Sequence, residues 1–341
     1  MGDVSSLQLL WFALIGVLFS GFFFLEGFDF GVGMSTRFLA KNRAERDQIV
    51  HTIGPVWDGN EVWLLTAGGA MFASFPGWYA AVFSGYYLIL FAILFGLIIR
   101  GVSFEFREKM DTQKGRNFWD WTLFIGSLLP PFFFGLLFTS MVQGMPLDAD
   151  GNMMATFTDY FTPFSIVGAV AVTLLCLLHG LNYIRLKTAG DIRVRAEKMA
   201  QKLYILLFVG LVAFAGLMYV STDFFTVHPV STLILLVVII VLSVLATFGA
   251  YKGKEWLSFL TSGLTLMAVV ALLFFGLFPR VMVGQESIYD LLIVNASSSP
   301  YTLKLMTWIS LSILPFVLAY QGWTYYIFRK RVKKEDVVGG H

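Results

Sequence analysis

The chain has 341 residues, of which 57% are apolar and only 13% are charged, against roughly 25% charged residues in an ordinary soluble domain. This composition excludes a typical water-soluble fold and indicates a membrane protein. The formal net charge of +2 gives no sign of a nucleic-acid partner, and a single cysteine excludes an intramolecular disulfide bond.

Eight segments are long and apolar enough to cross a bilayer, which takes about 20 residues. In chain order they are residues 7–33, 78–99, 119–142, 163–184, 203–220, 230–250, 257–278 and 305–328. The first segment has no Lys or Arg before it, and no small-residue cleavage site follows it. We therefore expect it to be a retained spanning helix and not a signal peptide.

A ninth segment, residues 52–75, contains Asp58, Asn60 and Glu61, so hydropathy alone does not decide whether it spans. Lys and Arg accumulate in cytoplasmic loops, and 22 of the 24 lie in five segments. These are residues 37–46, 100–116, 185–202, 252–254 and 329–334. The first two share a side only if the chain crosses twice between them. This predicts nine transmembrane helices, with the N-terminus outside the cytoplasm and the C-terminus inside.

No linker separates soluble domains, so we expect one all-α membrane domain over residues 1–341. Helices one to four (1–142) and five to eight (143–278) have the same in-out order. This favours two four-helix bundles, followed by a ninth helix and a basic cytoplasmic tail (279–341). The cysteine, Cys176, is expected to be a small residue of the core.

Four acids lie inside the predicted spans: Glu26 and Asp29 in the first, Asp58 and Glu61 in the second. Each pair is three residues apart and so shares a helix face, at similar depth in the cytoplasmic half. An ionisable side chain in the bilayer core costs at least about 2.5 kcal/mol, so such residues are functional by default. No Lys or Arg lies inside any predicted span to neutralise them. We therefore expect them to exchange protons near neutral pH, as a proton relay does.

The residues leave other interpretations open. The acids could cap helices or bond to Asn60 or Trp57, and carboxylates also form cation sites and the protonation switch of a transporter. Only His179 lies within a predicted span, so no haem and no metal are expected on this chain, and His179 is expected to be a hydrogen-bonded structural residue. No nucleophile triad or phosphate-binding glycine loop occurs, and no catalytic residue is expected.

Several motifs resemble subunit II of cytochrome bd-type quinol oxidases. They are EGFDFGVG at residues 26–33, GPVWDGNEVWLL at 54–65, TAGGA at 66–70 and NFWDW at 117–121. The resemblance is specific in the first 145 residues, and beyond them it depends on hydropathy and topology.

The resemblance implies a multi-pass subunit in the bacterial cytoplasmic membrane, surrounded by lipid and not catalytic alone. It implies a heterodimer with subunit I, which carries the b- and d-type haems and the quinol site, and commonly a small single-span subunit. The complex reduces oxygen to water with electrons from quinol and protons from the cytoplasm. It generates membrane potential without pumping.

Carried onto this sequence, the resemblance implies that Glu26 and Asp58 belong to a proton path, with Asp29 and Glu61 as supporting neighbours. Trp57 and Asn60 are further supporting residues, and Trp63 resembles a residue that some relatives place beside an oxygen route. Where relatives carry Asp at position 26, the longer side chain here changes the reach of the carboxyl. Two alternatives remain: a proton- or cation-coupled transporter and a purely structural scaffold.

Overall fold

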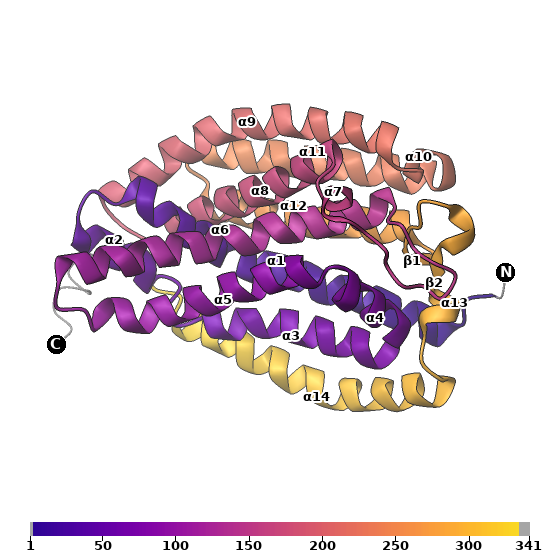
Figure 1. Ribbon diagram of the computed structural model, residues 1–341. Coiled ribbons are helices and arrows are strands. Elements are labelled where there is room, and N and C mark those ends of the chain that lie inside the picture. The colour runs from indigo at the N-terminus through magenta and orange to yellow at the C-terminus, as the bar shows by residue number, and fades with distance from the viewer. Residues whose placement is uncertain (1–2, 334–341) are drawn as a thin grey trace.

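The computed structural model describes residues 3–333, and its regular elements are almost all helices that run side by side along one axis (Figure 1). The long helices are α1 (Ser6–Leu39), α3 (Trp57–Ser74), α5 (Tyr87–Glu108), α6 (Gln113–Gln143), α8 (Pro163–Lys187), α9 (Asp191–Ser221), α11 (Pro229–Tyr251), α12 (Glu255–Leu277) and α14 (Pro300–Ile327). The short elements are α2 (Arg43–His51), α4 (Pro76–Gly85), α7 (Phe157–Tyr160), α10 (Phe224–Val227), β1 (Arg280–Met282), η1 (Ser287–Tyr289), β2 (Leu291–Leu292) and α13 (Ile293–Ala296).

Eight helices among residues 3–333 are long and apolar enough to cross a membrane, namely all the long helices except α3. This confirms the prediction of an all-α, polytopic membrane fold. The more polar segment that charge placement singled out does form a helix, α3, which packs on α1. The count of nine spans and the orientation of the termini stay predictions.

The prediction of one helix over residues 78–99 is wrong in its bounds. The segment begins as α4, with Pro76 at its first position, and breaks at Tyr86, whose backbone leaves the helical region (φ −91°, ψ 25°). The Tyr86 hydroxyl lies 3.0 Å from the Ser140 hydroxyl of α6, which anchors the break. The second part, α5, continues nine residues past residue 99 to Glu108. A hydropathy pattern ends a span at its first arginine. The helical backbone continues past that residue, because polar and charged side chains do not end a helix.

Helix α1 lies at the centre of the molecule. It packs against α3, α6, α8 and α12 and contacts α14 at its edge. It approaches α8 closely, because a β-carbon at Gly31 would lie 2.0 Å from the carbonyl oxygen of Cys176 and 2.7 Å from the α-carbon of Gly180. Only glycine lets two backbones approach so closely, so Gly31 and Gly180 fix the crossing of α1 and α8.

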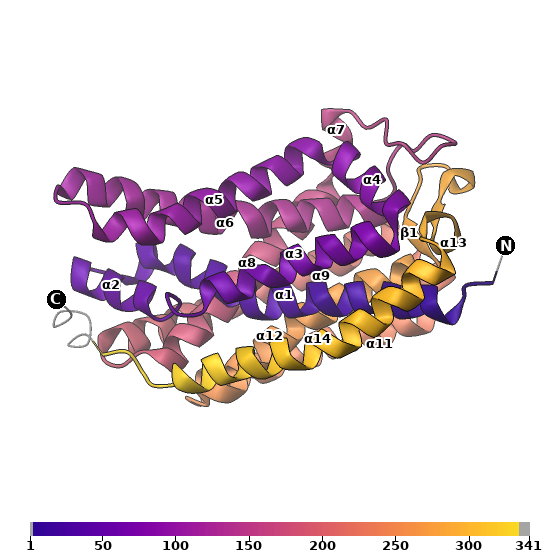
Figure 2. The same cartoon turned by 90° about the horizontal axis from the view of Figure 1, so that it is seen from below.

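The other helices form two groups beside α1. In the first group α5 packs on α6, α6 on α1, and α1 on α3; in the second, α9 packs on α8, α8 on α12, and α12 on α11. The groups meet where α8 and α12 pack on α1 and where α8 packs on α6, so they share one core. Helix α14 lies outside both groups, along α3 and α1 (Figure 2). The division at residues 142/143 and 278/279 stays a prediction.

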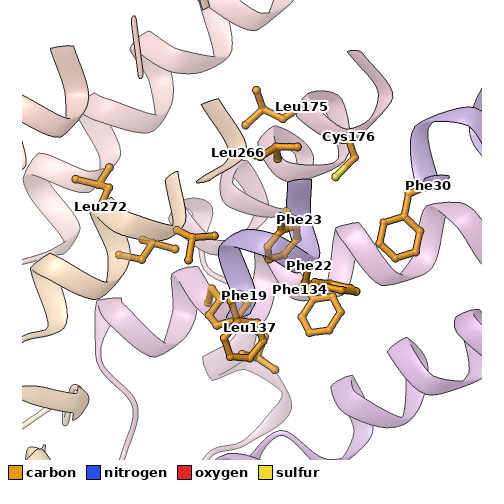
Figure 3. Packing of buried hydrophobic residues seen from close by; sticks show 14 of the residues in the cluster. Phe19, Phe22, Phe23, Phe30, Phe134, Leu137, Leu175, Cys176, Leu266 and Leu272 are labelled. Carbon is orange, nitrogen blue, oxygen red and sulfur yellow. The ribbon is translucent and has the colours of Figure 1, made fainter. Parts of the chain in front are cut away.

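The core contains an aromatic cluster between α1 and α6 (Figure 3). The Phe134 ring lies 5.4 Å from the Phe22 ring and 5.8 Å from the Phe23 ring, at interplanar angles of 66° and 80°. These edge-to-face contacts match the ring quadrupoles. Cys176 of α8 is fully buried in the same core, as its sequence predicts. Because lipid is as apolar as these rings, they stabilise the bundle by close packing and not by leaving water.

Residues 329–333 bind back to the helix ends beside α2. The Val332 amide donates to the Lys187 carbonyl at 2.8 Å, and the Gln48 side chain donates to the Val332 carbonyl at 2.9 Å. The Lys187 ammonium donates to the Lys330 carbonyl at 3.0 Å. The C-terminal end of α14 is therefore attached to α2 and α8. Lys334, the last residue of the predicted basic tail segment, lies outside the described residues.

The glycine contact between α1 and α8 generates a first prediction. Gly31→Ala places a methyl group where the Cys176 carbonyl lies, so the two helices must separate. We expect a loss of about 1–3 kcal/mol, as for other overpacked cores, measured as a lower unfolding temperature of the purified protein. Gly210→Ala on α9 is the matched control, because nothing lies within 4 Å of its β-carbon. Equal stability of the two variants would contradict the close contact.

Candidate functional site

The four predicted acids lie on α1 and α3, and they differ in how far they are buried. Glu26 and Asp29 of α1 are fully buried. The Glu61 side chain of α3 is 20% exposed, and Asp58, in the first turn of α3, is exposed. A negative charge in the first turn of a helix is favoured by the helix dipole. The structure thus places Asp58 at an uncovered surface and the other three acids inside.

A buried arginine joins the inner acids. Arg100 of α5 has a fully buried side chain and forms an ion pair with Glu26, and its Nη2 lies 3.7 Å from Glu61 Oε1. Its guanidinium carbon lies 4.7 Å from the centre of the Phe30 ring of α1. Asp29 is close enough to act on the same guanidinium. The prediction that no Lys or Arg lies inside a span with the acids is therefore wrong.

Close packing of α5 on α6 explains how Arg100 is buried. A β-carbon at Gly126 would lie 2.7 Å from the Gly96 carbonyl oxygen and 2.8 Å from the Arg100 backbone nitrogen. The backbones of α5 and α6 therefore nearly touch at Gly96 and, one turn later, at Arg100. This close contact directs the Arg100 side chain into the bundle, toward α1. Gly96 is the sequence signal that could have found this, because small residues mark the packed side of a membrane helix.

We call Glu26, Asp29, Glu61 and Arg100 the acid–arginine cluster. Three carboxyls and one guanidinium are neutral together when the carboxyls hold two protons. Among the described residues, Asp29 Oδ1 and Arg100 Nε have no hydrogen-bond partner. The cluster can therefore gain or lose protons, since a buried guanidinium offsets part of the negative charge at each step. Asp58 lies close enough to Glu61 to act on its charge, which connects the cluster to the surface of α3.

Two further residues reach the site from α14. The Asn60 side chain of α3 donates to Asp29 Oδ2 at 2.7 Å and accepts from the Tyr325 hydroxyl at 2.6 Å. The Trp63 indole donates to Gln321 Oε1 at 2.9 Å. Tyr325 and Gln321 are not among the site residues that the sequence predicts. The available signal was two polar side chains one turn apart on an apolar helix.

The remaining predicted residues lie apart from the cluster. Trp57 stacks on Phe104 of α5, with ring centres 4.8 Å apart. Both ring nitrogens of His179 are occupied, by the Ser262 hydroxyl at 2.8 Å and the Phe24 carbonyl at 2.9 Å. This histidine is a hydrogen-bonded structural residue. Among the described residues, no group of three His, Cys, Asp or Glu side chains could hold a metal ion.

Comparison with known proteins identifies the family of this chain. The family model for cytochrome bd terminal oxidase subunit II matches residues 7–328. The chain belongs to this family. It is 52% identical over 334 residues to the cytochrome bd ubiquinol oxidase subunit 2 of Bacillus subtilis, which covers 98% of this chain and 99% of the relative. It is 34% identical to the cytochrome bd-I ubiquinol oxidase subunit 2 of Escherichia coli K12, over 99% of this chain and 98% of the relative.

The structure also resembles a solved bd oxidase from Geobacillus thermodenitrificans. The TM-score is 0.75, the match covers 95% of this chain and 99% of the other, and the sequences are 14% identical, so this likeness shows the fold alone. Membership of the cytochrome bd terminal oxidase subunit II family confirms the resemblance found in the motifs. It makes this chain a multi-pass membrane subunit of an oxidoreductase, and it does not favour the transporter alternative.

The buried ion pair generates a second prediction. Arg100→Met leaves Glu26 in the bundle without its cation, so we expect a loss of about 3–5 kcal/mol of stability. The double variant Arg100→Met with Glu26→Gln removes the unpaired carboxyl at position 26, so part of the loss is recovered, although Glu61 and Asp29 still lack the guanidinium. Thermal unfolding of the four proteins of this cycle measures the coupling. Lys109→Met, at an exposed position of α5's end, is the control. Additive effects of the two changes would contradict the pairing.

Proposed function

We propose that this chain is the non-haem subunit of a bd-type quinol:oxygen oxidoreductase in the bacterial cytoplasmic membrane. Two relatives named ubiquinol oxidase subunits align with 98% or more of this chain, which supports quinol as the electron donor of the complex. The chain is not catalytic alone. A partner, subunit I, binds the b- and d-type haems and quinol, and the haems supply the electron transfer and oxygen reduction.

The acid–arginine cluster carries the proposal. Reducing oxygen to water consumes protons, which must cross low-dielectric protein to reach a buried centre. Carboxyls that exchange protons inside the membrane are the usual means of such transfer. Here Glu26, Asp29 and Glu61 hold and pass protons, and Asp58 extends the path to the uncovered face of α3. Asn60, Trp57 and Trp63 support α3 in this position.

Arg100 sets how many protons the cluster holds. With one guanidinium among three carboxyls, a state with two protons is neutral, and loss of one proton leaves a single negative charge. Two net negative charges in the bundle cost far more, because the interior screens charge poorly. The cluster therefore exchanges protons one at a time. Protons that enter from the cytoplasmic side and are consumed in the membrane generate a potential without a pump.

The surface that would meet subunit I is the side formed by α3 and α14. Leu303 is the only buried side chain of α14, and Trp308 and Phe316 are 64% and 77% exposed. Asp58 is exposed on α3, so protons would pass from it to a partner that covers this helix. A small single-span subunit would complete the complex, with lipid on the outer faces of α9 and α11, which are rich in exposed apolar residues.

Crosslinking tests the proposed partner surface. Phe316→Cys on α14 and Val212→Cys on α9 are similarly exposed, at 77% and 75%, and the native Cys176 is buried. With a membrane-permeant thiol–amine crosslinker in native membranes, we expect Phe316→Cys to be joined to the haem-bearing subunit and Val212→Cys to remain unlinked. Crosslinking of Val212→Cys alone would place the partner on the opposite side.

Oxygen consumption tests the proton path. Glu26→Gln removes an exchangeable proton from the cluster and keeps the side-chain volume, so we expect turnover of the intact complex to fall about tenfold or more. The haem content and reduction of the haems by quinol should not change. Glu105→Gln, on the exposed side of the same bundle, is the matched control. Full turnover of both Glu26→Gln and Asp58→Asn in an assembled complex would support a structural scaffold instead.

A further inference from the structure

Helix α14 contacts α3 through two polar side chains spaced one turn apart. Tyr325 donates to Asn60 at 2.6 Å, and Gln321 accepts from Trp63 at 2.9 Å. The rest of α14 between these contacts and its outer end is largely exposed apolar surface. Of the two contacts, only the one from Tyr325 leads on to an acid of the cluster, because Asn60 also donates to Asp29.

The chemistry of this chain of three groups depends on the charge of Asp29. An ionised carboxylate can only accept hydrogen bonds, so the Asn60 NH₂ group must face Asp29 and its carbonyl must face Tyr325. Asn60 is fully buried, so neither end of its amide can turn to water. When Asp29 holds a proton on this oxygen, the carboxyl can donate. The reversed amide then places its carbonyl toward Asp29 and gives up the longer bond, 3.4 Å, from its NH₂ group to the Leu25 carbonyl.

A phenol hydroxyl fits both arrangements because it both donates and accepts. Tyr325 donates to the Asn60 carbonyl in the first orientation and accepts from the Asn60 NH₂ group in the second. A phenylalanine at this position would leave one end of the buried amide unpaired in either orientation. An unpaired buried NH₂ group and an unpaired buried carbonyl do not cost the same free energy, so loss of the Tyr325 hydroxyl would shift the balance between the two states.

We propose that Tyr325 is a positioning residue of the proton path, which keeps the Asn60 amide hydrogen-bonded in both protonation states of Asp29. The inference rests on the proposed function. The last turn of α14, the ninth helix predicted from the sequence, thereby gains a role in the site. Through Tyr325, the proton exchange of Asp29 depends on how α14 is seated against α3.

Infrared difference spectroscopy of the complete complex, comparing reduced and oxidised states, tests this inference. The carboxyl stretching band that disappears in Asp29→Asn belongs to Asp29. In Tyr325→Phe we expect this band to shift in frequency, and turnover per haem to slow about two- to tenfold, the range for losing one hydrogen bond to a neutral group. An unchanged band together with unchanged turnover would overturn the role of Tyr325.

Two control variants distinguish a positioning role of Tyr325 from a general loosening of α14. Gln321→Leu removes the other side-chain hydrogen bond between α14 and α3, and Tyr326→Phe changes the neighbouring tyrosine, which is 61% exposed. Both should leave the Asp29 band in place. A shift of the band in Gln321→Leu as large as in Tyr325→Phe would show general loosening and overturn the proposal. If Tyr325→Phe lowers the yield, the assembled fraction is compared per haem. Full turnover of Asp29→Asn would contradict the proton path itself, whatever the Tyr325 variant shows.

Discussion

The ion pair between Arg100 and Glu26 is the interaction on which the rest of the structure depends. Both side chains are fully buried in a bundle whose core is mostly apolar. Either charge is costly in the bundle without a partner, so the ion pair holds the helices that carry it, α1 and α5, in position. Glycine contacts of α5 with α6 and of α1 with α8 hold those positions from either side. The packing of the bundle and the electrostatics of the site therefore depend on each other.

Helix α3 connects the buried ion pair with the proposed function. Among the long helices of residues 3–333 it alone is not apolar enough to count as a membrane span, and its polar residues face two ways. Asn60 and Glu61 turn toward α1 and α5, where they meet Asp29 and Arg100. Asp58 stays at the surface. A helix of this kind is stable in a membrane because its neighbours satisfy its polar groups, and the same groups link the buried cluster to the surface that we assign to the partner.

Much of the fold could be predicted from the sequence, because the signal for it is local. Runs of apolar residues identified eight helices, and the alternation of basic segments pointed to α3, where composition was ambiguous. The bounds were less predictable. Residues 78–99 form parts of two helices, because the break at Tyr86 depends on a contact with Ser140 in a distant helix.

The acids of the site could also be found from the sequence, since each is unusual where it lies. Their partners could not. Arg100 follows directly on an apolar run, so the pattern assigns it to a cytoplasmic loop, and only the approach of Gly96 to Gly126 carries it inside. Tyr325 is separated from Asn60 by 265 positions in the chain, and no local pattern marks that contact. Long-range pairing of this kind is decided by packing in three dimensions.

The central claim is that the acid–arginine cluster delivers the protons consumed in oxygen reduction. The most direct test is the voltage across proteoliposomes that contain the complete complex, followed in time after a single reaction with oxygen. We predict that Glu61→Gln slows the voltage rise that accompanies proton uptake, while the preceding electron transfer between the haems keeps its rate. A voltage rise with the wild-type rate and amplitude in Glu61→Gln and in the corresponding Glu26 variant would contradict the account.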